Sequence, residues 1–150
     1  MAKIDVTRHI KIVEKIPFVK NLSIRQIQQV LKAGNLETHP FGASLFRQGD
    51  KSLGLYILLA GELVVQDGNT EIARVKPVDI VGEMGVVSNE PRSATIKVTQ
   101  EATLISVSKM QFDVLLKNDV DMAARIFRNM LDSLIGKLRS TNEHIKSGVL

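Results

Sequence analysis

The chain has no cysteine, and this absence excludes several kinds of chemistry. Its 150 residues can form no disulfide framework, no thiolate-held iron–sulfur cluster and no nucleophilic thiol. Only three histidines are present, and His9, His39 and His144 lie in separate segments. Because metal sites need clustered ligands, the sequence predicts no metal cofactor. It disfavours both a cupin-type metalloenzyme and a haem sensor.

Long apolar runs are missing as well. No stretch approaches the roughly 20 apolar residues that a membrane-spanning helix needs. The first ten residues, MAKIDVTRHI, lack the apolar core of a secretory signal. Hydrophobic residues make up 44% of the chain and charged residues 24%, which is close to the average for folded soluble domains. We therefore expect a soluble, cytoplasmic protein without membrane contacts.

The net charge of +4 is concentrated at one end of the chain. The first 32 residues carry seven Lys or Arg against two acidic residues, so the remainder is close to neutral. Basic residues spread through an amphipathic pattern are more often a solvated helix face than a nucleic-acid surface. The charge alone does not predict DNA binding.

The hydrophobic pattern of the single domain, residues 1–150, begins with helices and changes to strands. Residues 1–35 carry apolar residues at helical spacing, with Pro17 interrupting and Ser23 placed to cap a second helix. Residues 36–108 alternate short β-branched and aliphatic runs with turn formers. These runs are ASLF, LYILLA, ELVVQ, IARV, ATIKV and TLISV. Many short strands predict a jelly roll or a β-sandwich.

The pattern is helical again over residues 109–142, and residues 143–150 form a tail. Six apolar residues in this part follow the 4-3-4-3-4 spacing of a coiled-coil seam; they are Val120, Ala124, Phe127, Leu131, Leu134 and Leu138. A second row, Met122, Ile126 and Met130, indicates a helix with two surfaces to bury. One surface fits the domain itself. The other fits either a homodimer or an effector protein, and the spacing leaves open whether the seam has any partner outside its own domain.

One stretch, VGEMGVVSNEPRSATI at residues 81–96, places two opposite charges around a turn. Gly82 and Gly85 let the backbone approach a ligand and free amide groups to point at an anion. Arg92, if it faced the interior, would be a buried charge best compensated by a bidentate oxyanion such as phosphate. Glu83 is an acceptor when ionised and suits hydroxyl groups. A simple Glu83–Arg92 ion pair is the alternative, and spacing does not decide between the two.

The segment GEMGVVSNEPRSAT resembles the phosphate-binding cassette of the cyclic nucleotide-binding domain family, in which Gly-Glu, a short helix and Pro-Arg-Ser-Ala-Thr recur in this order. The upstream GDKSLGLYILLAGELVV and the Pro17-Phe18 turn are similar to that family too. Val78 and Val81 depart from it, where glycine and phenylalanine are usual. The resemblance extends over nearly the whole chain. It implies a mainly β fold, an eight-stranded antiparallel jelly-roll β-barrel with N-terminal helices and C-terminal hinge and lid helices.

The resemblance also implies roles for individual residues. Arg92 would bind the exocyclic phosphate oxygens, Glu83 would accept from the ribose 2′-hydroxyl, and Ser93 would add a hydroxyl near phosphate and base. The implied ligand-binding residues are Gly82, Glu83, Met84, Gly85, Arg92, Ser93 and Ala94. Candidates for the pocket wall or the lid are Tyr56, Leu58, Val81, Arg125, Arg128 and Asn129.

The function implied is a sensor or regulatory domain and not an enzyme. Its ligand would be cAMP or cGMP, with cAMP favoured and no further cofactor, and binding would change the position of the C-terminal helices. About a dozen residues follow Leu138, too few for a winged helix-turn-helix, so no DNA-binding module is expected. The alternative is a degenerate jelly-roll scaffold or dimerisation module that binds no nucleotide.

Overall fold

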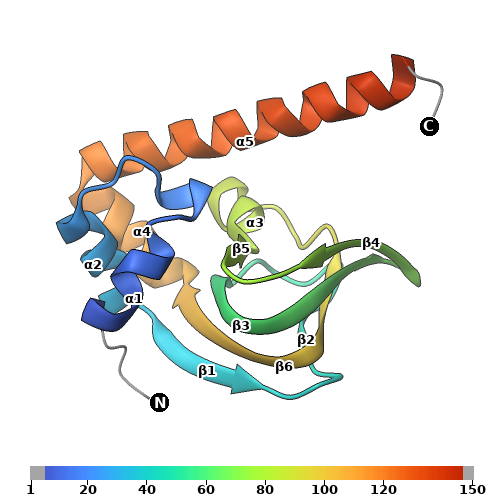
Figure 1. Cartoon of the computed structure of the whole chain (residues 1–150). Coiled ribbons are helices and arrows are strands. Elements are labelled where there is room, and N and C mark those ends of the chain that lie inside the picture. Colours follow the sequence, from blue (N-terminus) through green and yellow to red (C-terminus); the bar gives the residue numbers. More distant parts are fainter. Residues whose placement is uncertain (1–5, 147–150) are drawn as a thin grey trace.

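The computed structural model describes residues 6–146 as a bent antiparallel sheet, with the N-terminal and C-terminal helices packed together on one side of it (Figure 1). The mainly β architecture with flanking helices is therefore confirmed. The helical elements are α1 (Val6–Val13), η1 (Pro17–Val19), α2 (Ile24–Lys32), α3 (Glu83–Ser88), α4 (Lys109–Asn118) and α5 (Val120–Lys146). The strands are β1 (Asn35–His39), β2 (Ser44–Phe46), β3 (Gly54–Asp67), β4 (Thr70–Val75), β5 (Asp79–Val81) and β6 (Thr95–Ser108).

The second helix begins where the sequence predicts it, at Ser23. The Ser23 hydroxyl accepts a hydrogen bond from the amide of Gln26 at 3.1 Å, and the Gln26 side chain accepts one from the amide of Ser23 at 2.9 Å. Two of the unpaired amides at the helix start are satisfied in this way. The Gln26 side-chain amide also donates to Asp119 and Asp121. The same residue therefore caps α2 and ties it to the start of α5.

Six strands are present in residues 6–146, so the expected count of eight is not confirmed. The sheet order is β1-β6-β3-β4, with β2 on β6 and β5 on β3. The runs LYILLA and ELVVQ lie in one 14-residue strand, β3, and the runs ATIKV and TLISV lie in β6. Gly61, at φ +93°, sits where the β3–β6 register shifts. A bulge of this kind bends a strand while its pairing continues.

Two buried clusters lie on opposite faces of these long strands. Leu55 and Ile57 of β3 face the helices, where Phe112 of α4 and Ile126 of α5 are fully buried. Leu58 belongs to the second cluster, which fills the interior of the roll. Both faces of the central strands are covered, and the apolar runs are nearly continuous for that reason.

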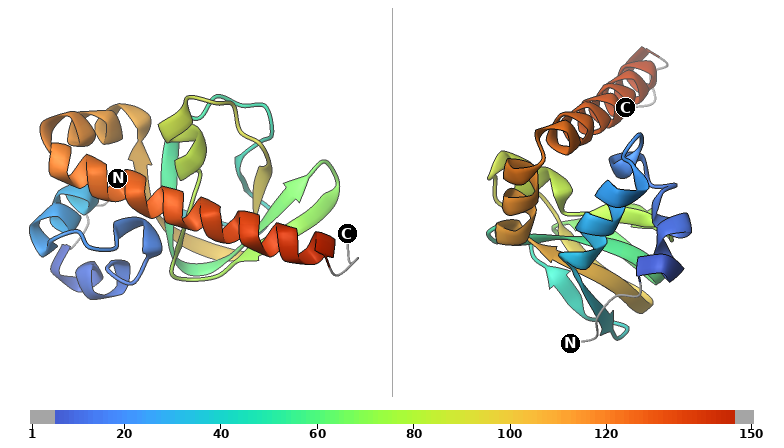
Figure 2. Two further views of the ribbon diagram at one scale, coloured as in Figure 1. Left: turned by 90° about the horizontal axis from the view of Figure 1, so that it is seen from above. Right: turned by 90° about the vertical axis from the view of Figure 1, so that its left-hand side faces the viewer.

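The last helix, α5, has 27 residues and reaches Lys146, into the segment expected to be a tail. It begins beside α2 and α4 and passes over the side of the roll that carries α3 (Figures 1 and 2). Met122 and Ile126 are fully buried, whereas residues 131–142 are all exposed. Only the first part of α5 is therefore fixed by the domain core.

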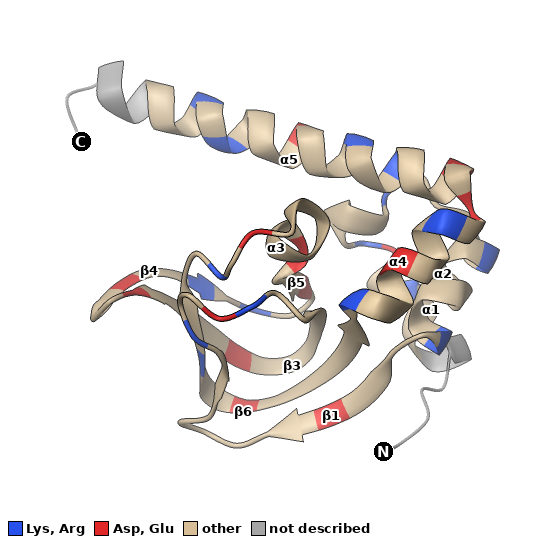
Figure 3. Cartoon of the chain, turned by 180° about the vertical axis from the view of Figure 1, so that it is seen from behind, with Lys and Arg blue, Asp and Glu red and all other residues tan. Residues whose placement is uncertain are grey.

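Charged residues are interspersed over helices and strands in the view of Figure 3. Acidic and basic side chains both occur along α5, which begins with the Asp121–Arg125 ion pair. Within residues 6–146, no helix combines the length and the apolar character that crossing a membrane requires.

Gly61 provides a test of the bent strand. A Cβ at this position would overlap the carbonyl oxygen of Glu101, and φ is unfavourable for alanine. Gly61→Ala should lower the free energy of unfolding by roughly 2–5 kcal/mol in urea denaturation. Gly42→Ala is the matched control, because its φ is +87° but a Cβ there meets open space; its cost should be only about 1–2 kcal/mol. Equal losses of unfolding free energy in the two variants would show that close packing at Gly61 does not contribute to stability.

Candidate functional site

The stretch at residues 81–96 forms the end of β5, the short helix α3 and a loop that leads into β6. Gly82 has a φ of +82° and lies against the guanidinium of Arg92, so that a Cβ here would come within 2.6 Å of Nη1. A Cβ at Gly85 would overlap the side chain of Ser52. The two glycines therefore make room for neighbouring side chains of this chain. The need for glycine at these two positions therefore arises from packing within the chain, whether or not a ligand approaches the backbone there.

Arg92 is a buried cation, with only 6% of its surface exposed. Its Nη1 donates to the carbonyl of Gly82 at 2.9 Å, and its Nη2 donates to the carbonyl of Gly54. The buried Nε has no hydrogen-bond partner. Burial lowers the pKa of this guanidinium, because the charged form loses hydration. Among the described side chains, no carboxylate lies within ion-pair distance of it.

Glu83 is a second ionisable group at this place, and it is half-buried. Burial is the largest influence and raises the pKa of its carboxyl, which Asp79 raises further. Lys137 and Arg92 act in the opposite direction as nearby positive charges. No Glu83–Arg92 ion pair occurs in the described part of the chain. The two opposite charges therefore lie near each other without pairing.

A cavity of about 550 Å³ contains both charged groups. It brings together Val81 and all seven residues implied by the resemblance, which are Gly82, Glu83, Met84, Gly85, Arg92, Ser93 and Ala94. A guanidinium that keeps an unused donor can bind an oxyanion bidentately. A carboxylate a short distance away can accept from hydroxyl groups. The cavity is therefore suited to one ligand that carries both an anion and hydroxyls.

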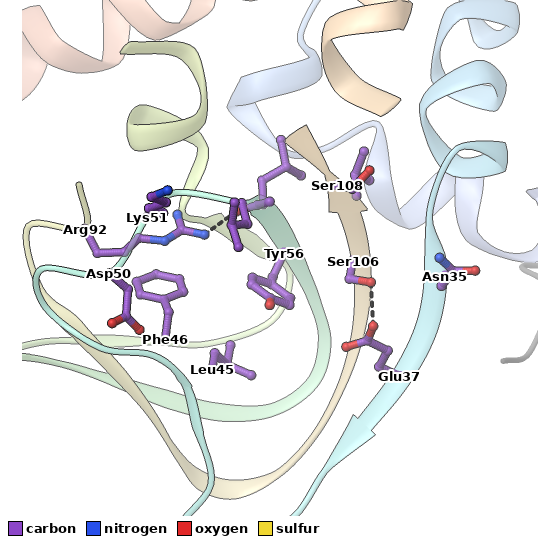
Figure 4. Close-up of a pocket in the computed structure, with 14 residues that line it drawn as sticks. Asn35, Glu37, Leu45, Phe46, Asp50, Lys51, Tyr56, Arg92, Ser106 and Ser108 are labelled. Atoms are coloured by element: carbon purple, nitrogen blue, oxygen red, sulfur yellow. Dashed lines mark hydrogen bonds between the residues drawn. The ribbon is translucent and has the colours of Figure 1, made fainter. Parts of the chain in front are cut away.

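The other wall and lid candidates do not line this cavity, although Asn129 borders a smaller one of about 250 Å³ that Glu83 also lines. Leu58 is fully buried in the core of the roll. Tyr56 lines a second hollow of about 440 Å³, which Arg92 and Phe46 also border (Figure 4). Asn129 donates to the carbonyls of Phe18 and Lys20 and so fixes α5 on η1.

The two candidate arginines of α5 also lie outside the cavity. Arg125 binds the carbonyl of Asn21 and the carboxylate of Asp121. Arg128 lines a groove on the outer side of α5 together with Phe127 and Leu131. In this structure, neither arginine takes part in the candidate site.

The sequence analysis missed four charged residues that line the cavity, namely Arg74, Asp79, Glu90 and Lys137. Lys137 lies seven residues after Met130, the last member of the inner row of α5. Continuing that row by two helical turns would have predicted its position. Arg74 carries no comparable signal, because its role depends on how β4 folds over the roll.

The fold and the cavity together define a β-roll domain whose cavity is lined by a buried arginine. The model of the cyclic nucleotide-binding domain family matches residues 36–119, more than half of the chain. The chain therefore belongs to this family, which confirms the resemblance found in the sequence.

Known relatives agree with this assignment. A cyclic nucleotide-gated potassium channel of Mesorhizobium japonicum is 27% identical over 124 residues, which cover 83% of this chain and 34% of the channel. The chain spans about a third of the length of the first curated relatives that it matches. A cyclic nucleotide-binding domain from Methylobacillus flagellatus superposes with a TM-score of 0.78 at 23% identity, over 97% of this chain and 84% of that one.

A further solved structure contains a ligand. The regulatory domain of protein kinase A from Toxoplasma gondii, crystallised with cAMP, superposes with a TM-score of 0.73 at 25% identity. The match covers 90% of this chain and 52% of that one.

The raised pKa of Glu83 predicts a pH effect on stability. In the unfolded chain this carboxyl ionises near its ordinary pKa of 4.5, but in the folded protein it ionises only at higher pH. Its protonated form therefore stabilises the fold at low pH, and this contribution is lost as pH rises through the folded pKa. Glu83→Gln should become more stable relative to the wild type between about pH 4 and about pH 7. Urea denaturation at both pH values measures this change.

Glu101→Gln is the control, because Glu101 is exposed on β6. It should show no comparable change with pH. A constant difference between Glu83→Gln and the wild type would contradict the raised pKa.

Proposed function

We propose that this chain is a cyclic-nucleotide sensor, a regulatory binding domain and not an enzyme. The observation that carries the proposal is the buried, carboxylate-free Arg92 in the same cavity as Glu83. A buried guanidinium without a counter-ion is costly unless an anion completes the site. A cyclic nucleotide supplies a phosphate and a ribose hydroxyl in one rigid molecule. The family assignment supports this ligand class.

Each group of the cavity has a proposed role. Arg92 binds the exocyclic phosphate oxygens, and backbone amides near Met84 and Gly85 complete the anion site. Glu83 accepts a hydrogen bond from the ribose 2′-hydroxyl. Ser93 adds a hydroxyl beside the phosphate. We favour cAMP over cGMP, in line with the cAMP-bound regulatory domain that this chain resembles.

The proposed response is a movement of the C-terminal helices. The Gly54 carbonyl, which accepts from Arg92, belongs to the residue paired with Ser108 at the end of β6. The Ser108 hydroxyl caps α4 by accepting from the amide of Gln111 at 3.1 Å. A shift of Arg92 toward a phosphate would therefore act on the start of α4, and through it on α5. Lys137, which lines the cavity from the exposed half of α5, would close on the bound ligand.

Arg92→Ala tests the proposed ligand class. Loss of a bidentate charge contact should weaken binding of cAMP or cGMP by roughly 2–5 kcal/mol, or tens to thousands of fold. Isothermal titration calorimetry measures this loss, with circular dichroism to verify the fold. Arg128→Ala, on the outer side of α5, is the matched control and should bind as the wild type does. Wild-type protein that binds neither nucleotide would favour the scaffold without a ligand.

A second role, self-association, is favoured by the outer face of α5. The seam residues stay exposed in the single chain, with Phe127 46%, Leu131 56% and Leu138 59% accessible. Their heptad spacing suits a like helix, because two identical seams can interlock. A second copy of this chain is therefore the partner that we propose for this face. A separate effector protein is the alternative occupant.

Leu131→Asp should disrupt that dimer, because it places a charge in the centre of the seam. Sedimentation velocity should show wild-type dimer and mutant monomer at the same protein concentration. Ile72→Asp, which changes an equally exposed residue on β4, is the control and should remain dimeric. A wild-type monomer throughout the micromolar range would contradict self-association through α5.

A further inference from the structure

An aromatic ring lies against the Arg92 guanidinium. The Cζ atom of Arg92 lies 3.8 Å from the centroid of the ring of Phe46, the last residue of β2. Figure 4 shows the Phe46 ring next to the guanidinium of Arg92. A cation held over an aromatic face is attracted by the ring quadrupole, and this attraction is stronger where water is excluded. The ring therefore compensates part of the charge that no carboxylate neutralises.

An aromatic partner leaves the N–H donors of the guanidinium unused, whereas a carboxylate would occupy some of them. A carboxylate would use in-plane N–H donors and compete with an incoming phosphate for them. Phe46 instead covers one face of the plane. Of the five N–H donors of an arginine, one binds the Gly82 carbonyl and one the Gly54 carbonyl, while Nε has no partner. The charge therefore has no carboxylate partner, and three of the five donors form no hydrogen bond within the described residues.

The Phe46 ring also packs against a second aromatic ring. Phe46 and Tyr56 have centroids 6.2 Å apart at an interplanar angle of 30°. Phe46 borders both the candidate cavity and the second hollow, whereas Tyr56 borders only the latter of these two. Phe46 therefore contacts both Arg92 and Tyr56. Tyr56 does not line the candidate cavity, and it reaches the candidate site through its contact with Phe46.

We infer that Phe46 is a positioning residue for the phosphate contact of Arg92, holding the guanidinium plane so that its free donors face the ligand. This inference rests on the proposed function. It assigns a role to a residue on β2, outside the cassette at residues 81–96.

The test compares two substitutions at Phe46 by calorimetry with cAMP and cGMP. Phe46→Leu keeps an apolar side chain but removes the aromatic face, and binding should weaken about 5- to 30-fold. Phe46→Tyr keeps the face and should bind within about threefold of the wild type. Phe41→Leu is the control for the chemical change, because Phe41 is 77% exposed. Its affinity should be unchanged.

A spectroscopic readout tests the stack without ligand. In ¹⁵N-edited NMR, the ring should shift the Arg92 Nε–H resonance of the wild type upfield. Phe46→Leu should remove that shift and Phe46→Tyr should retain it. Addition of nucleotide should move the same resonance downfield as Nε–H binds the phosphate. If Phe46→Leu does not fold, the Arg92 Nε–H resonance of the wild type and of Phe46→Tyr still tests the contact. An unshifted resonance in both proteins would contradict it.

The outcomes separate this inference from the proposed function. Wild-type binding that Phe46→Leu leaves unchanged overturns the role of Phe46 alone. Equal losses in Phe46→Leu and Phe46→Tyr also overturn it, because a packing role would not distinguish the aromatic variant from leucine. Wild-type protein that binds neither nucleotide overturns the proposed function, and this inference with it.

Discussion

The buried guanidinium of Arg92 is the constraint on which the rest of the site depends. Its donors reach the carbonyls of Gly82, directly after β5, and of Gly54 at the start of β3, and its face rests on Phe46. Gly82 must lack a side chain because the guanidinium occupies that space. A charge in such a place is stable only when its whole surroundings are arranged for it. The cassette, β2 and the start of β3 form one unit around this cation.

The family, and the grouping of the cassette residues around one cavity, could be predicted from the sequence, because the cassette is local. The glycines, Glu83 and Arg92 lie within a dozen residues, so their order fixes their neighbourhood. The number of strands could not be predicted in this way. Gly61 has the signature of a turn, and only the pairing of β3 with β6 shows that the strand continues through it.

Residues far from the cassette were harder to place. The face on which a strand residue lies depends on its register, so the fully buried Leu58 could not be told from a pocket wall. The hydrogen bonds of Asn129 could not be predicted either, because its partners are carbonyls of η1 and its C-cap, over a hundred residues earlier. Phe46 had no signal at all, because its importance comes from the one cation that folds over it.

The two long strands, β3 and β6, also determine how the domain unfolds. β3 and β6 each contribute residues to the core under the helices and to the core inside the roll. Neither core can lose its packing without breaking the same ladder of hydrogen bonds, so the two must melt together. Amide hydrogens along β3 and β6 should therefore exchange through one cooperative opening. The exposed half of α5 lies outside that unit and can fray while the rest of the protein stays folded.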